Sequence, residues 1–222
     1  MAITSLVGSQ IITKFRNYVN DSLEGDFEYQ LLNDAKNEIE QLAMWEVLKY
    51  MDSSQTVTAG DTSSTTHALP SNFNSPLSLF VGTEYQPYTL VSFEDQRIWR
   101  DYTRGWFINA AGSTYALTGT AGATNTIYLL HTKFSDDIAA ATSWSAFPAR
   151  FHDIIPLYMA RMYYTANSGE KGRSWDDRLE KYYMDTLNQM KMWDFNLKNR
   201  AKQWSFPMGY AGSHGNPMVA FY

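Results

Sequence analysis

Histidines and carboxylates are the side chains with which this sequence could perform acid–base or metal chemistry. The chain of 222 residues has no cysteine, which excludes thiol catalysis, disulfides and thiolate zinc sites. The histidines form neither an HExxH motif nor a His-rich cluster. The four are His67, His131, His152 and His214. We therefore expect no enzyme activity, no bound metal and no cofactor.

The best polar group lies in the stretch Phe147–Asp153, where Arg150 precedes His152 and Asp153. A His–Asp pair can act as a general base. It can also bind the exposed N–H groups at the start of a helix, and this role is favoured because Pro148 suits a first helical turn. The residues assigned to this structural helix start are Phe147, Pro148, Arg150, Phe151, His152 and Asp153.

Two further motifs resemble sites but lack a deciding feature. The pairs Asp136-Asp137 and Asp176-Asp177 are typical of solvated or capping carboxylates. Gly119–Ala123 lacks the Gly-Lys-Ser/Thr ending of a phosphate loop, and a hairpin tip explains it better. Neither motif therefore predicts a ligand.

A mixture of aromatic and basic residues leaves one binding function open. Trp99, Arg100, Arg104 and Trp106 follow one another closely, as in some carbohydrate and nucleic-acid sites. An ordinary exposed sheet face has the same pattern. The alternative function is a carbohydrate- or receptor-binding module, and it predicts a concave aromatic site around Trp99, Trp106 and Tyr115.

Apolar residues recur at helical spacing in four segments that would position these groups. The segments are residues 4–20, 26–51, 147–167 and 174–203. The third segment joins the two ends of the chain, and its apolar face predicts a core helix. That face consists of Phe151, Ile154, Ile155, Tyr158, Met159 and Met162.

Short β-branched or aromatic runs separated by turn residues fill the middle of the chain. The expected strands are Thr56–Thr58, Thr66–Pro70, Leu77–Val81, Tyr85–Val91, Trp106–Asn109, Thr114–Leu117 and Thr126–Leu130. Ser92 is expected to cap a short helix that reaches Tyr102. A loop over 134–145 then leads back to the helices.

These elements predict an α+β fold. We expect an antiparallel helical bundle of about four helices, a β-rich insertion and an extended C-terminal tail. The expected units are N-terminal helices 1–53, a β-rich insertion 54–146, C-terminal helices 147–203 and a tail 204–222.

The tail is rich in aromatic residues although its glycines and prolines oppose a helix. Its large apolar residues are Trp204, Phe206, Met208, Tyr210, Met218, Phe221 and Tyr222. About 18 extended residues at roughly 3.3 Å each could span some 60 Å. Two interpretations stay open: the tail docks on a partner or a neighbouring copy, or it folds back on its own domain.

Charge is unevenly distributed along the chain. Residues 1–54 carry 4 Lys/Arg and 9 Asp/Glu, whereas residues 147–222 carry 10 Lys/Arg and 7 Asp/Glu. Such a subunit could pair head to tail with its own copies, or both faces could simply be solvated. The overall charge of −5 argues against tight wrapping of nucleic acid.

No apolar run is long enough to span a membrane, and the N-terminus lacks the pattern of a signal peptide. We therefore expect a cytosolic protein without a membrane partner.

The order of these parts resembles the head-to-tail connector proteins of tailed bacteriophages. That family includes adaptor and head-completion proteins and the tubular gatekeeper proteins of short-tailed phages. The segments that carry the resemblance, which covers about residues 10–200, are Asn37–Glu40 with Met44–Leu48, Leu69–Phe73 with Leu77–Val81, Tyr128–Thr132, and Phe147–Asp153. The order of these motifs along the chain carries the resemblance.

The resemblance implies a non-enzymatic virion protein that forms a ring, commonly of twelve copies, beneath the portal protein. Its other partner would be a downstream neck or tail protein, and DNA would pass through the ring as transient cargo. The protein would lie in the neck of the virion after assembly in the host cytoplasm. The tail would then dock on the portal or on a neighbouring subunit.

Overall fold

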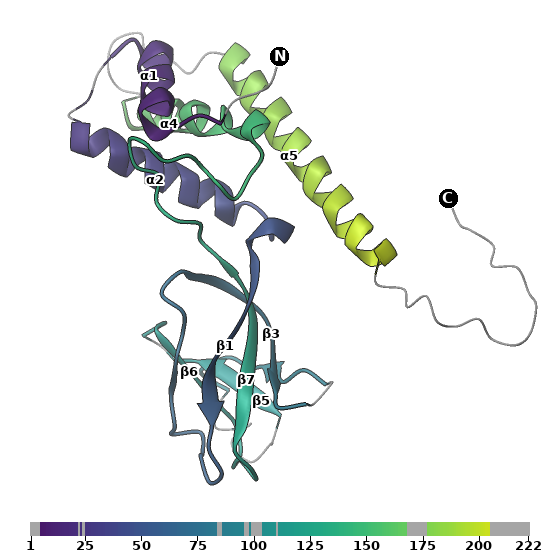
Figure 1. Ribbon diagram of the computed structural model, residues 1–222. Helices are drawn as coiled ribbons and strands as arrows, with labels where there is room; N and C mark the ends of the chain where they lie inside the picture. Colours follow the sequence, from purple (N-terminus) through teal and green to yellow (C-terminus); the bar gives the residue numbers. More distant parts are fainter. Residues whose placement is uncertain are drawn as a thin grey trace, which may run out of the picture.

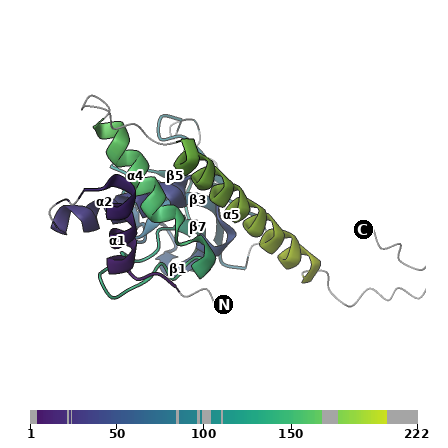
Figure 2. The ribbon, with the colours of Figure 1, turned by 90° about the horizontal axis from the view of Figure 1, so that it is seen from above.

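A computed structural model describes residues 5–21, 23, 25–83, 86–95, 98, 104–109, 111–167 and 177–204, with side chains in the last helix as far as Asn199. These residues form four α-helices and two β-sheets. A helical part and a β part lie at opposite ends of the molecule (Figure 1). The described helices cross one another around α4 (Figures 1 and 2). The structure therefore confirms the α+β class but does not confirm the expected antiparallel bundle.

The helical part packs around the helix α4. The elements are α1 (Gly8–Val19), α2 (Gly25–Gln41), η1 (Glu46–Leu48), η2 (Ala149–Phe151), α4 (Ile154–Ala166) and α5 (Asp177–Trp204). α4 contacts α1, α2 and α5. Leu157 and Ala160 are therefore buried together with the predicted core residues Ile154, Ile155 and Met159. A helix with neighbours on several sides buries more than one stripe.

The second helix ends earlier than its sequence pattern predicted. We expected it to reach Met51, but α2 stops at Gln41 and a strand begins at Lys49. The indole of Trp45 folds back, and its Nε1 donates a hydrogen bond to the carbonyl oxygen of Ile39 at 3.0 Å. This bond occupies a carbonyl in the last turn of the helix, where carbonyls lack intrahelical partners. The buried Trp45 therefore turns the chain toward the β part.

The start of the core helix also differs from the prediction. Pro148 precedes the single 3₁₀ turn η2, and the α-helix begins only at Ile154. The apolar spacing across Phe151, Ile154 and Ile155 was correct, since all three are buried. A 3₁₀ turn and an α-helical turn place such residues on similar faces, so periodicity alone could not separate them.

The β part contains two sheets. Its strands are β1 (Lys49–Val57), β2 (His67–Ala68), β3 (Phe73–Val81), β4 (Thr89–Leu90), β5 (Gly105–Ile108), β6 (Thr114–Leu117) and β7 (Asn125–Lys133). One sheet has the order β1-β7-β3 and the other β2-β6-β5-β4. The pairs are antiparallel except β4 with β5. β7 alternates buried and partly buried residues, as expected for a strand with one face on a core.

Most strand predictions fall on observed strands, although β1, β3 and β7 are longer than predicted. Ser92, the expected cap, accepts a hydrogen bond at its Oγ from the Asp95 N–H at 3.2 Å. Most of the helix expected after it, and the predicted cap Ser174 of the last helix, lie outside the described residues. Bulges in the pairing of β1 and β3 with β7 explain why simple alternation did not reveal the full strand lengths.

We predict that His67 makes the β part sensitive to acid. Burial lowers the pKa of the His67 imidazole, and the nearby Asp61 carboxylate raises it by less. A lowered pKa in the folded state means that stability is fully present above the unfolded pKa of about 6.5 and falls as pH drops below it. Between pH 7.5 and 5.5, urea denaturation should therefore show a larger loss of stability for the natural chain than for His67→Phe. Parallel pH profiles would contradict this prediction.

Candidate functional site

His152 ties the N-terminal segment to the turn that precedes α4. The imidazole is buried, and its Nδ1 accepts a hydrogen bond from the Leu6 N–H at 3.2 Å. Its Nε2 lies 3.0 Å from the carbonyl oxygen of Phe147 and donates to it. Both ring nitrogens are thus hydrogen-bonded to backbone groups. This arrangement suits a structural histidine and leaves no ring atom directed at a substrate.

Asp153 does not have the capping role that its position suggested. It occupies the N-cap of α4 without a side-chain capping bond. Its carboxylate instead pairs with Lys14 of α1 and accepts a hydrogen bond from the Tyr182 hydroxyl at 3.4 Å. Asp153 therefore links α1 and α5 across the start of α4. Such a tertiary link has no signature in local sequence.

Phe147 lies in an aromatic cluster that closes the helical core. Its ring is centred 4.2 Å from Trp144, 5.4 Å from Trp45 and 6.1 Å from Trp193. Phe151 adds a further contact to Trp193 at 5.5 Å. The cluster joins the end of α2, the segment that returns from the β part, and α5. Aromatic pairs at these separations add to the free energy of burying the rings.

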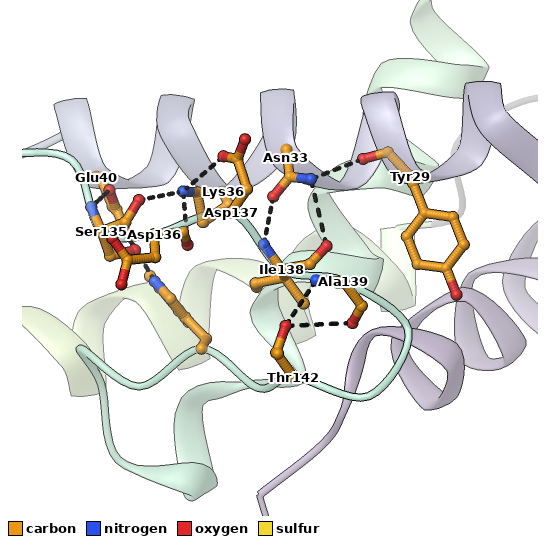
Figure 3. A network of polar contacts seen from close by, with 11 residues as sticks. Tyr29, Asn33, Lys36, Glu40, Ser135, Asp136, Asp137, Ile138, Ala139 and Thr142 are labelled. Carbon is orange, nitrogen blue, oxygen red and sulfur yellow. Dashed lines mark hydrogen bonds and ion pairs between the residues drawn. The ribbon is translucent and has the colours of Figure 1, made fainter. Parts of the chain in front are cut away.

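A junction of polar side chains on α2 holds the segment that returns from β7 (Figure 3). We use "junction" for the contacts of Asn33, Lys36 and Glu40 with residues 135–139. The Glu40 carboxylate is fully buried and accepts hydrogen bonds from the Ser135 N–H at 3.0 Å and from the Ser135 hydroxyl. It also accepts a bond from the Trp144 Nε1 at 2.7 Å. One carboxylate therefore serves three donors.

The other two junction residues satisfy the backbone of the same segment. Lys36 is fully buried and donates to the carbonyl oxygens of Ser135 at 2.6 Å and Asp136 at 3.2 Å. Asn33 accepts from the Ile138 N–H at 2.8 Å and donates to the Ile138 carbonyl at 3.3 Å (Figure 3). The junction thus fixes where the chain re-enters the helical part.

The start of α1 also contacts the segment that returns from β7. The Gly8 N–H donates to the Thr142 carbonyl oxygen at 2.9 Å, and a Cβ at Gly8 would collide with the Ala139 backbone. Residues 135–142 are therefore held between α1 and α2. The sequence analysis did not predict this arrangement, although the spacing of Asn33, Lys36 and Glu40 is that of residues that share one helix face.

The exposed charges beside this junction are all acidic. Three charged side chains in α2 and residues 134–142 are buried, namely those of Glu28, Lys36 and Glu40. The remaining charged residues are exposed; they are Asp26, Asp34, Glu38, Asp136 and Asp137. We call these five residues the acidic side; the Glu38 carboxylate among them accepts a hydrogen bond from the Tyr158 hydroxyl of α4 at 2.5 Å. Buried Lys36 contacts the Asp137 carboxylate at 3.4 Å, but that carboxylate is 79% exposed.

The helix α5 presents a very different surface. Tyr183, Leu187 and Met190 bury one face of it, whereas Met192 and Phe195 on the opposite side are 60% and 58% exposed. Lys191 and Lys198 are also exposed there. We call Met184, Lys191, Met192, Phe195 and Lys198 the α5 outer face. Its charged residues are the two lysines, and the exposed carboxylate of Asp185 lies at its N-terminal end, next to Met184.

A groove of about 770 Å³ runs beside this face. Its lining includes Arg150, Phe151, Asp185, Met192 and Trp193. The Arg150 guanidinium lies 4.6 Å above the Phe151 ring. Such a combination of aromatic, methionine and arginine side chains is typical of protein–protein contacts.

Comparison with known protein families identifies the family of the chain. Residues 8–205 match the family described as SU10 adaptor protein. The chain is an SU10-type phage adaptor. The predicted resemblance to phage head-to-tail connectors is confirmed, and the adaptor is a structural virion component that assembles with other phage head and tail proteins. No curated protein matches the chain.

Within the described residues, Trp106 and Tyr115 do not form the exposed aromatic site that a carbohydrate-binding function would require. Trp106 and Tyr115 are 1% and 0% exposed, and their rings pack edge to face at 5.9 Å in the β core. Trp99 and Arg100 lie outside the described residues. Sequence proximity suggested an exposed cluster, but strands β5 and β6 direct these two rings inward.

The other residues that the sequence singled out either line a cavity of the β part or lie outside the described residues. Gly119–Ala123 lines a cavity of about 460 Å³ in the β part, together with His67. No group of three or more potential metal ligands occurs within the described residues. No helix of that part is both long and apolar enough to cross a membrane. Asp176 and His214 are not described.

The aromatic tail predicted for residues 204–222 lies almost entirely outside the described residues. Trp204 ends α5, but its side chain is not described, and the other predicted docking residues lie outside the described residues. Those residues are Phe206, Met208, Tyr210, Met218, Phe221 and Tyr222. Docking of the tail on the portal or on a neighbour therefore stays a prediction.

Proposed function

We propose that this adaptor forms a ring of about twelve copies in the neck of a tailed-phage virion, between the portal and the next tail component. The match of residues 8–205 to a phage adaptor family carries the proposal. The helical residues of 1–53 and 147–203 would form the body of the ring. The β residues 54–146 would extend from it toward a neighbouring component, as their separation from the helices allows (Figure 1).

The charge of the chain supports passage of DNA through such a ring. A surface that repels phosphate groups lets DNA slide, whereas a basic surface holds it by releasing counterions. The net charge of −5 favours the first behaviour. The ring is expected not to retain double-stranded DNA at physiological salt in a gel-shift assay.

The tail is proposed to fasten the ring to the portal or to an adjacent subunit. Burial of each large aromatic side chain could contribute about 1.5–3 kcal/mol before ordering costs. The segment 204–222 holds five aromatic residues, enough for tight attachment. Ordering of this segment on binding would then accompany assembly.

Co-purification with the portal protein tests the function and the role of the tail separately. The full chain should bind the portal, and a chain ending at Trp204 should bind at least about 10-fold more weakly, since a lost aromatic contact of about 1.5 kcal/mol already has that effect. A matched control carries residues 205–222 replaced by a Gly/Ser segment of equal length. Unchanged binding after truncation would reject the tail's role alone, whereas absence of any binding by the full chain would reject the proposed function.

A further inference from the structure

The C-terminal half of α5 is exposed in a way that an isolated subunit does not explain. α5 is 28 residues long, or about 42 Å at 1.5 Å per residue. Its C-terminal end projects beyond the other helices (Figures 1 and 2). The α5 outer face exposes Met192 and Phe195 over this stretch. A contiguous exposed apolar stripe with a groove beside it marks a protein contact.

The charged residues beside this stripe indicate which kind of partner surface would bind it. The exposed charged residues among 190–199 are Lys191 and Lys198, and the one acid of that stretch, Asp194, is turned inward. The Asp194 carboxylate accepts a hydrogen bond from the Glu46 N–H at 2.6 Å, and burial raises its pKa. A partner for this face should therefore be acidic, with some apolar area.

The acidic side of the same molecule has these properties. Its five exposed charged residues are all carboxylates, and Phe27, beside Asp26 on α2, is 54% exposed. α4 contacts both α2 and α5. One subunit therefore carries two surfaces of complementary charge, one on α2 with residues 136 and 137 and the other on α5.

We propose that the α5 outer face of each copy packs against the acidic side of the next copy. This inference rests on the proposed ring and names the two surfaces that build it. A contact between two different surfaces is heterologous, and its repetition produces a closed ring when the rotation between neighbours divides the circle. The two lysines lie opposite carboxylates in this contact, and Met192 and Phe195 are covered.

The junction gives the acidic side a fixed shape. Asp136 and Asp137 belong to the segment that Lys36, Asn33 and Glu40 hold against α2. Buried Lys36 also lowers the local repulsion among these carboxylates, since its ammonium lies 3.4 Å from Asp137. The acids are therefore positioned before a neighbour arrives, which reduces the ordering cost of binding.

Charge reversal tests the contact in the full chain. Size-exclusion chromatography with light scattering and native mass spectrometry would measure assembly of Lys191→Glu/Lys198→Glu and of Asp34→Lys/Asp136→Lys. Each double variant should assemble at least about 100-fold more weakly than the natural chain, because like charges then face each other across the contact. The control Asp52→Lys/Glu94→Lys reverses two acids of the β part and should assemble normally.

A charge swap distinguishes a direct contact from misfolding. The two double variants mixed in equal amounts should form the natural oligomer again, because each then offers a face of opposite charge to the other. The quadruple variant should also assemble alone. Normal assembly of both double variants, or no rescue on mixing, would overturn the inference while leaving the ring intact. A natural chain that forms no closed oligomer, alone or with the portal, would instead overturn the proposed function.

Discussion

Replacement of Glu40 with alanine is expected to lower the free energy of unfolding of the isolated chain by about 3–5 kcal/mol, because it removes the acceptor of three buried hydrogen bonds. The Glu40 carboxylate is fully buried and accepts bonds from the Ser135 N–H, the Ser135 hydroxyl and the Trp144 indole. Alanine leaves these donors without an acceptor inside the protein, and each unpaired donor costs about 1–3 kcal/mol. Urea denaturation followed by circular dichroism would measure the loss.

Two further variants test whether the loss of stability is specific to the buried carboxylate. Glu40→Gln keeps one oxygen acceptor and should lose less stability than Glu40→Ala. Asp34→Ala removes an exposed carboxylate from the same helix and should change stability by no more than about 0.5 kcal/mol. If Glu40→Ala unfolds at the same urea concentration as Asp34→Ala, the junction does not stabilise the fold.

Replacement of Phe147 with alanine is expected to have a similar effect for a different reason. Phe147 is 4% exposed and its ring contacts Trp45, Trp144 and Trp193. Removal of a buried phenyl ring leaves a cavity and typically costs about 3–5 kcal/mol. Thermal and urea unfolding should both show this loss, together with increased tryptophan exposure in fluorescence emission.

The matched control for this change is Phe93→Ala, because Phe93 is 40% exposed and contacts Phe107 at 6.1 Å in the β part. It should cost clearly less than Phe147→Ala. A Phe147→Leu variant should recover much of the loss, since it refills part of the cavity. Equal losses for Phe147→Ala and Phe93→Ala would be inconsistent with a central role for the aromatic cluster.

The two expected losses of stability arise from residues that hold the same segment of the chain. Glu40 and Phe147 both hold the segment that returns from β7, one by hydrogen bonds and the other by packing. This segment joins the β part to the helical part and carries part of the acidic side. Variants that loosen it should therefore also weaken assembly, but without rescue by the charge-swapped partner.

Local patterns predicted the elements that depend on neighbours in sequence. The apolar face of the core helix was correct at Ile154, Ile155 and Met159, because a helix buries residues at fixed spacing. Thr114–Leu117 was predicted with its exact bounds. These cases need only periodicity and turn residues, which are properties of short stretches of chain.

Errors arose where a distant contact overrode the local pattern. The helix expected to reach Met51 ends at Gln41, where the Trp45 indole binds a helix carbonyl and the following residues pair with β7. Trp106 and Tyr115 seemed suited to an exposed site, yet the sheets bury them. Strand pairing and burial both depend on residues far along the chain, which no local window contains.

By itself, the sequence determined the α+β class, the absence of thiol chemistry, the uneven charge and, through the order of its motifs, the relation to phage connectors. The tertiary structure was needed to show that Lys36 and Glu40 are buried while their acidic neighbours are exposed. The reason is physical: charge and spacing are read along the chain, whereas burial and the direction of a surface depend on which distant segments pack together.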